Sequence, residues 1–329
     1  MEEKITASDL RYHMASHNIL FIGGAGFIGS SVIKEMLNTA EGTERIFVME
    51  PAWANISRIE NLPIIIYRGI ISDIDLIETI VRTANIGKIV HLVSTMVPGC
   101  GYDEYKQELE NVLFPTIRLM QLCSRLKVQF VFFSSGGTVY GERKTMIPFV
   151  ETDPKEPISY YGLSKQMIEN SILFENRMSD LQYLILRPSN PYGHGQNING
   201  RQGLIAVALG RILTGKPITI WGDGNSVRDY IYVDDLAKVV VQLLRDNVTN
   251  SIVNIGSGRG YSVKEVIDVL KDVVNEEVKV EYTESRKNDV SNMILDTTLL
   301  SSLVEMDLTP LNKGIRQFYE YEKRRIGLG

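Results

Sequence analysis

The chain has little of what marks several classes of protein. Among its 329 residues only two are cysteines, Cys100 and Cys123, and they lie far apart in no metal-binding spacing. This pattern fits neither a disulfide framework nor a zinc site, so we interpret both as small apolar side chains and expect no metal. The net charge is −5 and the basic residues are dispersed along the chain. We therefore expect no nucleic-acid partner.

Long apolar runs are also missing. No run approaches the roughly 20 apolar residues that span a membrane. Residues 1–17 form a polar, acidic extension that lacks the apolar core of a secretory signal. We therefore expect a cytoplasmic protein with no membrane association.

What the chain does contain is an alternation of short β-branched runs and helix-period stretches. This alternation is typical of a parallel sheet with crossover helices. It predicts a doubly wound α/β domain over residues 18–188, in which Ser72 is placed to cap the second helix. The expected strands are 18–22, 45–49, 64–68, 88–93, 129–133 and 182–187, and the expected helices are 27–38, 72–84, 104–126 and 161–177.

The amino-acid composition changes at residue 189, where Gly, Asn and Pro become frequent. We expect a smaller substrate-binding lobe over 189–228 and 261–329. The apolar stretch SIVNIG (251–256) is typical of a core strand, so the chain is expected to return to the first domain over about 229–260. Ser262 and Glu265 have capping-box spacing and predict a helix over 261–274.

A glycine motif, GGAGFIG (23–29), separates the first strand from the first helix. Gly23 suits the tight turn, Gly26 admits a pyrophosphate against the backbone, and Gly29 allows close helix packing. Glu50, about 20 residues on, can accept from both ribose hydroxyls of NAD and would repel the extra phosphate of NADP. The motif therefore predicts a Rossmann-type NAD site.

A tyrosine and a lysine lie four residues apart in YYGLSK (160–165), so that Tyr161 and Lys165 share one face of a predicted helix. A phenol of pKa near 10 must lose about 3 units to act as a base at neutral pH. A neighbouring ammonium and a positively charged nicotinamide both favour the phenolate. This pair is the predicted catalytic base and its partner.

Six motifs together resemble one family over nearly the whole chain: GGAGFIG, SSGGTVYG, YYGLSK, RPSNPYG, GDGNSVRDYIYVDDLA and RKND. They resemble the extended short-chain dehydrogenase/reductases, and within these the nucleotide-sugar 4-epimerases. The resemblance implies NAD as a bound cofactor and UDP-glucose, UDP-galactose or an N-acetyl or uronic acid analogue as the substrate. It also implies a homodimer built from the helices at 104–126 and 161–177.

The resemblance further implies which residues line the two sites. Those implied for the cofactor, besides the glycines, Glu50, Tyr161 and Lys165, are Phe27, Ile28, Ile70, Leu92, Val93, Ser94, Ser134 and Ser189. Those implied for the sugar nucleotide are Ser135, Gly136, Asn190, Gly203, Leu204, Trp221, Arg228, Tyr230, Arg286 and Asp289.

Several positions depart from the family pattern. Ile70 stands where many members carry an aspartate, and HLVSTM (91–96) replaces the usual alanine-glycine stretch. His91 is interpreted as a packed core histidine. Gly137 and Thr138 stand where the dehydratases and decarboxylases of the family carry carboxylates, and their lack of one disfavours both chemistries.

The motif SSGGTVYG (134–141) also lacks a serine, because Gly136 stands where the epimerases carry the hydroxyl that bridges the tyrosine and the sugar. If the strand stays extended, Thr138 points to the same side as position 136 and replaces that hydroxyl. Ser135 is the alternative if the glycines bend the chain, and a water molecule is the third.

Two other functions stay open. A reductase of a 4-keto nucleotide sugar would use the same tyrosine and lysine, and a catalytically silent sensor would keep the fold alone. The sugar itself is also open, although the residues around Met293 align near a family position that limits an N-acetyl group.

Overall fold

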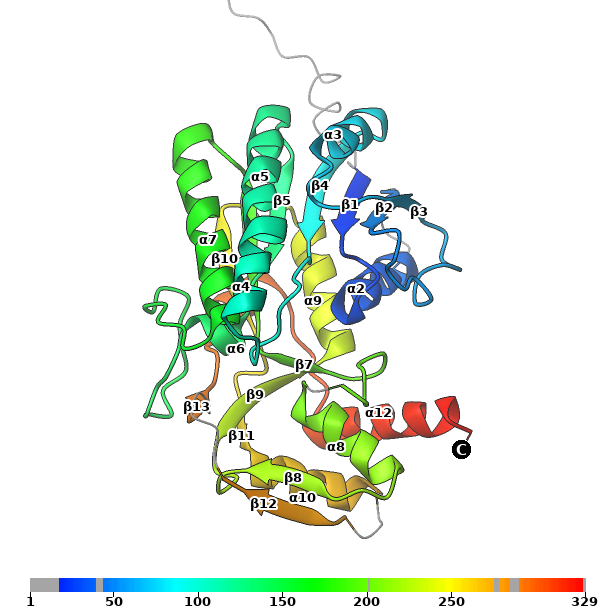
Figure 1. Cartoon of the computed structure of the whole chain (residues 1–329), viewed down its shortest axis with the longest axis vertical. Helices are drawn as coiled ribbons and strands as arrows, with labels where there is room; N and C mark the ends of the chain where they lie inside the picture. The colour runs from blue at the N-terminus through cyan, green and yellow to red at the C-terminus, as the bar shows by residue number, and fades with distance from the viewer. Residues whose placement is uncertain (1–17, 40–43, 201, 275–277, 285–289, 328–329) are drawn as a thin grey trace, which may run out of the picture.

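The computed structural model describes residues 18–39, 44–200, 202–274, 278–284 and 290–327. It contains a large lobe built on one sheet and a smaller lobe at the carboxyl ends of the strands of that sheet (Figure 1). The proposed substrate residues Arg286 and Asp289 lie outside the described residues.

The large sheet has seven strands in the order β10-β6-β5-β4-β1-β2-β3, and every neighbouring pair is parallel. The strand order reverses between β1 and β4, and ligands of doubly wound sheets bind at such a point. The predicted return of the chain to this sheet is confirmed by β10, which pairs with β6. The strands are β1 (Asn18–Ile22), β2 (Ile46–Glu50), β3 (Ile65–Arg68), β4 (Ile86–His91), β5 (Gln129–Phe133), β6 (Tyr183–Pro188) and β10 (Ser251–Ile255).

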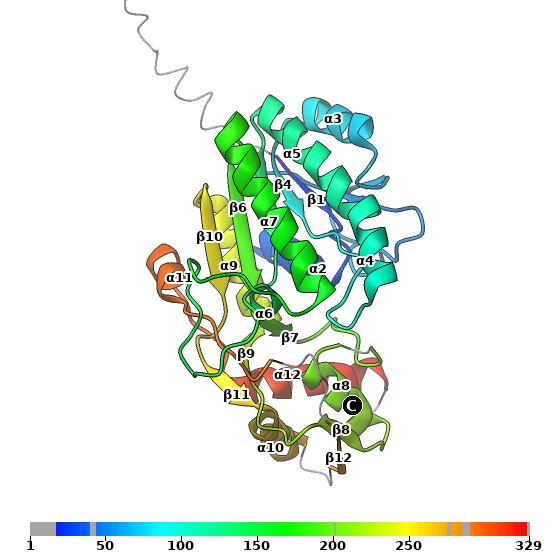
Figure 2. The same ribbon diagram turned by 60° about the vertical axis from the view of Figure 1, so that its left-hand side comes forward.

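Helices cover both faces of this sheet because its strands are apolar on both sides. Along β1, Ile19 and Phe21 pack into the core under one set of helices, and Leu20 and Ile22 pack into the core under the other. The first set is α2 (Phe27–Asn38) and α9 (Val233–Arg245), and the second is α3 (Ile74–Thr83), α5 (Phe114–Leu126) and α7 (Tyr160–Ser179). Figure 2 shows α5 and α7 side by side on the outer face.

Two helix boundaries differ from the prediction. Ser72 is not the cap of α3, because the helix begins after Asp73, whose carboxylate accepts from the Ile70 N–H at 2.8 Å. The stretch 104–126 is not one helix: α4 (Tyr102–Glu108) passes into a π-helical segment (Leu109–Leu113) before α5 begins. The capping box is confirmed, since Ser262 and Glu265 exchange side-chain and backbone hydrogen bonds at the start of α10 (Val263–Val274).

The smaller lobe contains short strands that the sequence patterns did not predict. In one sheet β9 (Val227–Tyr232) pairs with β7 (Asn190–Tyr192), β11 (Gly260–Ser262) and β13 (Asn292–Met293). In another, β8 (Ile218–Trp221) pairs with β12 (Val280–Thr283). The described helices of this lobe, besides α10, are α8 (Leu204–Leu213) and α12 (Leu311–Arg325). The short helix α6 (Gly136–Val139) lies at the junction, and α11 (Thr298–Leu303) packs against β10 of the large sheet.

A buried ion pair joins α7 to the sheet. Glu169 on α7 is fully buried and accepts from both Arg187 Nε at 3.0 Å and Arg187 Nη2 at 2.7 Å. Arg187 lies on β6 and is 1% exposed. Ser134 at the end of β5 and Lys155 also donate to Glu169. Three segments next to α7 therefore meet at one carboxylate of this helix.

Replacing Arg187 by glutamine should strongly destabilise the protein. Loss of one partner from a buried ion pair costs about 3–5 kcal/mol, because it leaves the other charge uncompensated. The matched control is Arg82→Gln, which breaks the surface pair with Glu78 and should cost below about 1 kcal/mol. Chemical denaturation measures the free energy of unfolding of both variants. Equal losses of stability in the two would contradict a stabilising role of the Glu169–Arg187 pair.

Candidate functional site

The glycine loop after β1 is shaped by close backbone contacts. Gly23 has φ +83°, and a Cβ there would lie 3.2 Å from the Val93 backbone nitrogen. A Cβ at Gly29 would lie 2.7 Å from the Gly24 carbonyl oxygen, so Gly29 is required by the loop itself. At Gly26 the nearest protein atom would be 3.7 Å away. Space therefore stays open against the backbone at Gly26.

The start of α2 suits the phosphates of a dinucleotide. Its N-cap residue, Gly26, makes no side-chain capping bond, and its first turn carries no acidic residue. The amide N–H groups of Phe27 and Ile28 and the helix dipole are thus available to an anion. This donor set and the open space at Gly26 fit the pyrophosphate of NAD.

Glu50 ends β2 and is 5% exposed. One of its oxygens accepts from the Ala25 N–H at 2.6 Å, which links the second strand to the glycine loop. Burial raises the pKa of the Glu50 carboxyl, and the Ala25 N–H and the Arg68 charge oppose this rise. The carboxylate that is predicted to bind the ribose therefore also holds the phosphate loop in place.

The other residues predicted for the cofactor follow the carboxyl ends of neighbouring strands. Ser134 donates to Glu169, and the buried Ser189 hydroxyl has no partner among the described residues. The strands are β3 for Ile70, β4 for Leu92, Val93 and Ser94, β5 for Ser134, and β6 for Ser189. Because these strands are parallel, the sheet places all of these residues at its carboxyl end. We call this row of residues the cofactor edge.

Tyr161 and Lys165 lie in the first turns of α7, which Ser159 caps by accepting from the Gly162 N–H at 3.1 Å. Lys165 Nζ lies 5.6 Å from the centre of the Tyr161 ring and donates to the Phe133 carbonyl oxygen at 3.1 Å. Tyr160 points elsewhere and stacks on Tyr105. The predicted pairing geometry is present.

The protein alone does not activate the phenol. Burial raises the pKa of Tyr161 to about 12, and the charge of Glu108 adds to the rise, while a hydrogen bond with Ser135 lowers it. Burial lowers the pKa of Lys165 to about 8, against the charges of Glu108 and Glu169. Lys165 is not among the groups that shift the pKa of Tyr161, so the expected lowering of that pKa by the ammonium is not found here.

The strand does not stay extended through SSGGTVYG, which was the condition for Thr138 to replace the missing hydroxyl. The chain turns into the short helix α6 at Gly136, so Thr138 does not alternate to the side of position 136. Its Oγ1 is buried and has no partner among the described residues. Ser135 is the neighbouring hydroxyl that lowers the pKa of the Tyr161 phenol by hydrogen bonding. The geometry therefore favours the alternative, Ser135, over Thr138.

Gly136 leaves no room for the serine of the family. A Cβ there would lie 2.6 Å from a Leu295 methyl carbon and 2.8 Å from the Arg187 carbonyl oxygen. A Cβ at Gly137 would make only ordinary contacts at 3.7–3.9 Å with Ser189, Asn190 and Ser135. The second glycine thus lies where the cofactor edge and the substrate residues meet.

A cavity of about 520 Å³ lies in the smaller lobe. Asn190, on β7, donates to the Asp229 carbonyl oxygen at 2.8 Å, which orients its side chain. Of the residues predicted for the substrate, Asn190, Gly203, Leu204, Trp221, Arg228 and Tyr230 line this cavity. The sequence reasoning missed Arg211 on α8 and Thr219 on β8, two elements that it did not predict, and Ser226 in the loop before β9.

His91 and Met293 are both buried in the structure. His91 is fully buried between Phe130 and Phe132, bonds to Thr116 at 2.9 Å, and has a pKa lowered to about 3 by burial, so its interpretation as a core residue is confirmed. Met293 is also fully buried, so its side chain is not exposed to a sugar.

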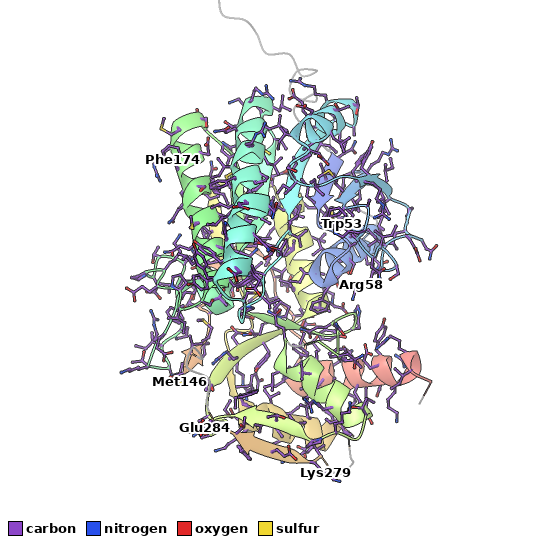
Figure 3. All side chains as sticks on the ribbon, in the orientation of Figure 1. Trp53, Arg58, Met146, Phe174, Lys279 and Glu284 are labelled. Carbon is purple, nitrogen blue, oxygen red and sulfur yellow. The ribbon has the colours of Figure 1, made fainter. Side chains whose placement is uncertain are left out.

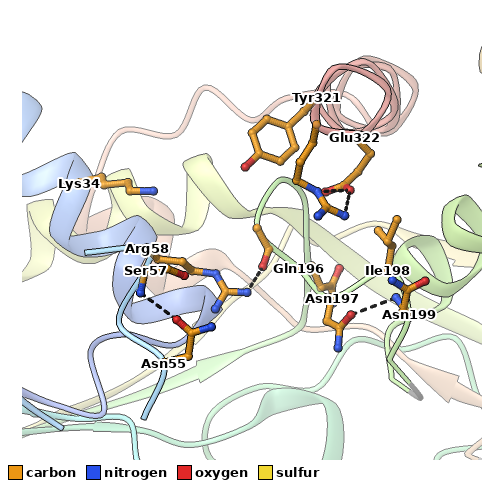
Figure 4. Close-up of a pocket in the computed structure, with 12 residues that line it drawn as sticks. Lys34, Asn55, Ser57, Arg58, Gln196, Asn197, Ile198, Asn199, Tyr321 and Glu322 are labelled. Carbon is orange, nitrogen blue, oxygen red and sulfur yellow. Dashed lines mark hydrogen bonds and ion pairs between the residues drawn. The ribbon is translucent and has the colours of Figure 1, made fainter. Parts of the chain in front are cut away.

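A second cavity, of about 480 Å³, lies between the lobes (Figure 4). Arg58, from the segment after β2, donates to the Gly195 carbonyl oxygen at 2.8 Å, and Lys34 on α2 points toward the same space. On the far side Arg325 pairs with Glu322 of α12. Arg58 therefore ties the lobes together beside the start of α2.

Within the described part of the chain, no cluster of three or more acidic, histidine or cysteine side chains could hold a metal ion. None of the described helices is both long enough and apolar enough to cross a membrane.

Comparison with known proteins decides the family. The model described as "NAD dependent epimerase/dehydratase family" matches residues 19–256. The chain belongs to the NAD-dependent epimerase/dehydratase family. This confirms the predicted resemblance and NAD as the cofactor, and it makes the protein an NAD-dependent enzyme.

Individual members of this family show how closely the chain is related. It is 31% identical to a putative UDP-glucose 4-epimerase of Methanocaldococcus jannaschii over 93% of this chain and 98% of that protein. It is 33% identical to a dTDP-4-dehydro-6-deoxyglucose reductase of Escherichia coli over 85% of this chain and 89% of that one. The UDP-glucose 4-epimerase of Thermotoga maritima, solved with UDP-glucose, superposes with a TM-score of 0.86 at 30% identity, covering 94% and 99% of the two chains. The predicted Rossmann-type fold is confirmed.

Adding a side chain at position 136 should destabilise this member of the family. Gly136→Ala forces a methyl group against the Leu295 side chain and a backbone oxygen, and such overpacking costs about 1–3 kcal/mol. Gly137→Ala is the matched control in the same helix and should be close to neutral. Denaturation midpoints measure both, and a stable Gly136→Ala protein would show that this contact is not tight.

Proposed function

We propose that this enzyme inverts C4 of a UDP-activated hexose through a transient 4-keto sugar. The observation that carries the proposal is the pair at the start of α7, where Lys165 Nζ lies 5.6 Å from the centre of the Tyr161 ring and donates to the carbonyl oxygen at the end of β5. The relatives named UDP-glucose 4-epimerases support the choice of reaction.

The residues of the chain have separate parts in this reaction. Bound NAD supplies the hydride acceptor for C4 and then the donor. Tyr161 takes the proton of the C4 hydroxyl and later returns it, while Ser135 holds that oxygen and the phenol in line. The Lys165 ammonium stabilises the phenolate as the proton arrives and leaves.

The lining of the cavity supports a nucleotide-sugar substrate. The Arg228 guanidinium suits a diphosphate, and Trp221, 44% exposed, offers a flat apolar surface to a base. Asn190 offers amide groups near the sugar end. We also keep Arg286 and Asp289 as proposed contacts of the diphosphate and ribose.

The experiment is direct. The purified enzyme should retain NAD and convert one of UDP-glucose, UDP-N-acetylglucosamine or UDP-glucuronate into its C4 epimer, as seen by proton NMR. Tyr161→Phe should abolish the conversion while NAD stays bound. If no C4 epimer forms from any of the three and NAD is still bound, this function is wrong.

A 4-keto nucleotide-sugar reductase is the second candidate, because of the Escherichia coli relative. Such an enzyme oxidises one reduced nicotinamide cofactor in each cycle and releases the oxidised form. Glu50, which would repel the extra phosphate of NADPH, argues against the usual donor. Stoichiometric oxidation of added NADH or NADPH by a 4-keto sugar nucleotide, with no epimerisation, would favour this candidate.

The two hydroxyls near Tyr161 can be separated by mutation. Ser135→Ala should lower kcat about ten- to a hundredfold, the effect of losing a hydrogen bond to a charged group. Thr138→Val is the matched control and should have little effect, since the Thr138 hydroxyl bonds to nothing in the described structure. Turnover at equal NAD occupancy measures both; the reverse order would restore Thr138 as the donor.

We further propose a cytoplasmic homodimer joined through α5 and α7. Large apolar side chains are exposed on these helices, with Phe114 57%, Phe174 51% and Met178 68% exposed. Figure 3 shows Phe174 on the outer surface of α7. The division into an NAD-binding domain (18–188 with 229–260) and a substrate lobe (189–228 and 261–329) is kept as a proposal.

A further inference from the structure

A fully buried carboxylate that no motif indicated lies beside the catalytic pair. Glu108, the last residue of α4, accepts three hydrogen bonds from the segment after β4. The donors are Ser94 Oγ at 3.0 Å, the Thr95 backbone N–H at 2.8 Å and Thr95 Oγ1 at 2.5 Å. Ser94 and Thr95 stand in the stretch that replaces alanine and glycine, so the two hydroxyls and Glu108 form one unit.

The place of Glu108 in the chain is unusual. It is followed at once by the π-helical segment 109–113, and π turns inside helices occur frequently at functional sites. Because α4 packs against α7, Glu108 lies within electrostatic reach of Tyr161 and Lys165. The carboxylate therefore connects the cofactor edge after β4 with the catalytic helix.

The effect of this charge on the pair has a definite sign. A negative charge disfavours the phenolate and favours the ammonium, so Glu108 raises the pKa of both Tyr161 and Lys165. The other titratable groups around the pair are Glu169, which also raises the pKa of Lys165, and His91, whose low pKa leaves it neutral. On α4 itself Tyr105 faces Tyr160.

We propose that Glu108 is a positioning residue that holds Ser94 and Thr95 beside the cofactor edge and supplies the negative charge that keeps Lys165 an ammonium. The proposal rests on the proposed function, in which Tyr161 is the base and Lys165 its cationic partner. Glu108 thus lowers the fraction of Tyr161 that is phenolate at a given pH, and in exchange keeps the buried Lys165 charged.

Glu108→Gln tests the charge, because it keeps the shape and removes the negative group. As the pH increases, kcat should rise while the Tyr161 phenol loses its proton and fall while the Lys165 ammonium loses a proton. The rising and falling limbs of this profile report the apparent pKa values of the coupled pair. Without Glu108 both groups deprotonate more readily. Both limbs of the kcat profile should therefore move to lower pH by about one unit, the usual effect of one nearby charge.

The matched control is Glu110→Gln, an exposed carboxylate two residues on, which should leave both limbs in place. A Glu108→Gln enzyme that loses activity at every pH, with both limbs unmoved, would overturn the proposed electrostatic role. Glu108→Asp retains the charge and should keep the profile of the native enzyme.

Thr95→Val tests the positioning separately, since it removes a hydroxyl donor and leaves the charge. It should lower kcat about three- to tenfold, the effect of one ordinary hydrogen bond, with the limbs unmoved. An unchanged kcat in Thr95→Val would overturn the positioning role of Glu108. This outcome can be read even if the Glu108→Gln variant does not fold.

A readout without substrate separates this proposal from the proposed function. In the NAD-bound protein labelled with ¹³C at the tyrosine Cζ, the signal assigned by Tyr161→Phe should titrate at lower pH in Glu108→Gln than in the native protein. A native protein that shows the titration but epimerises no sugar would contradict only the function. An identical titration in both proteins would contradict the role of Glu108.

Discussion

The carboxylate of Glu169 is the point on which the arrangement of the catalytic helix depends. It lies one turn beyond Lys165 on α7 and binds Arg187 of β6, Ser134 directly after β5, and Lys155. Arg187 continues the network to the Tyr140 hydroxyl at 2.7 Å, and this hydroxyl donates to Asn254 of β10. Because every member is bonded, the network can stay buried, and it aligns α7 with the strand ends that approach the cofactor.

The proposed cofactor site and the proposed substrate site meet at the carboxyl end of the sheet. The glycine loop, Glu50 and the residues after β4 present donors and open space for a dinucleotide, and the cavity between β7, α8 and β9 presents an amide, a guanidinium and an indole. We propose that Tyr161 and Ser135 act between them. Burial raises the pKa of Tyr161 and keeps the phenol protonated, and the proposal is that the charge of the bound cofactor helps to activate it.

The sequence predicted the elements with strong periodicity and the motifs with a fixed spacing. The large sheet, its helices and the Tyr161–Lys165 pair follow from such patterns, and six predicted substrate residues meet in one cavity. The bend at Gly136 was left open, because two glycines permit both an extended and a helical path. Glu108 was missed because its meaning comes from Ser94 and Thr95, which the fold brings to it from a different segment. The strands of the smaller lobe are too short to show a period.

The fate of the hydrogen on C4 tests the account most directly. A sugar nucleotide that carries deuterium at C4, incubated with the enzyme and excess unlabelled NAD, should give an epimer that retains the deuterium at C4. Retention would mean that the same bound cofactor accepts and returns the label within one closed site, as the account predicts. Loss of the deuterium to the free cofactor pool, or a product that is reduced rather than epimerised, would contradict it.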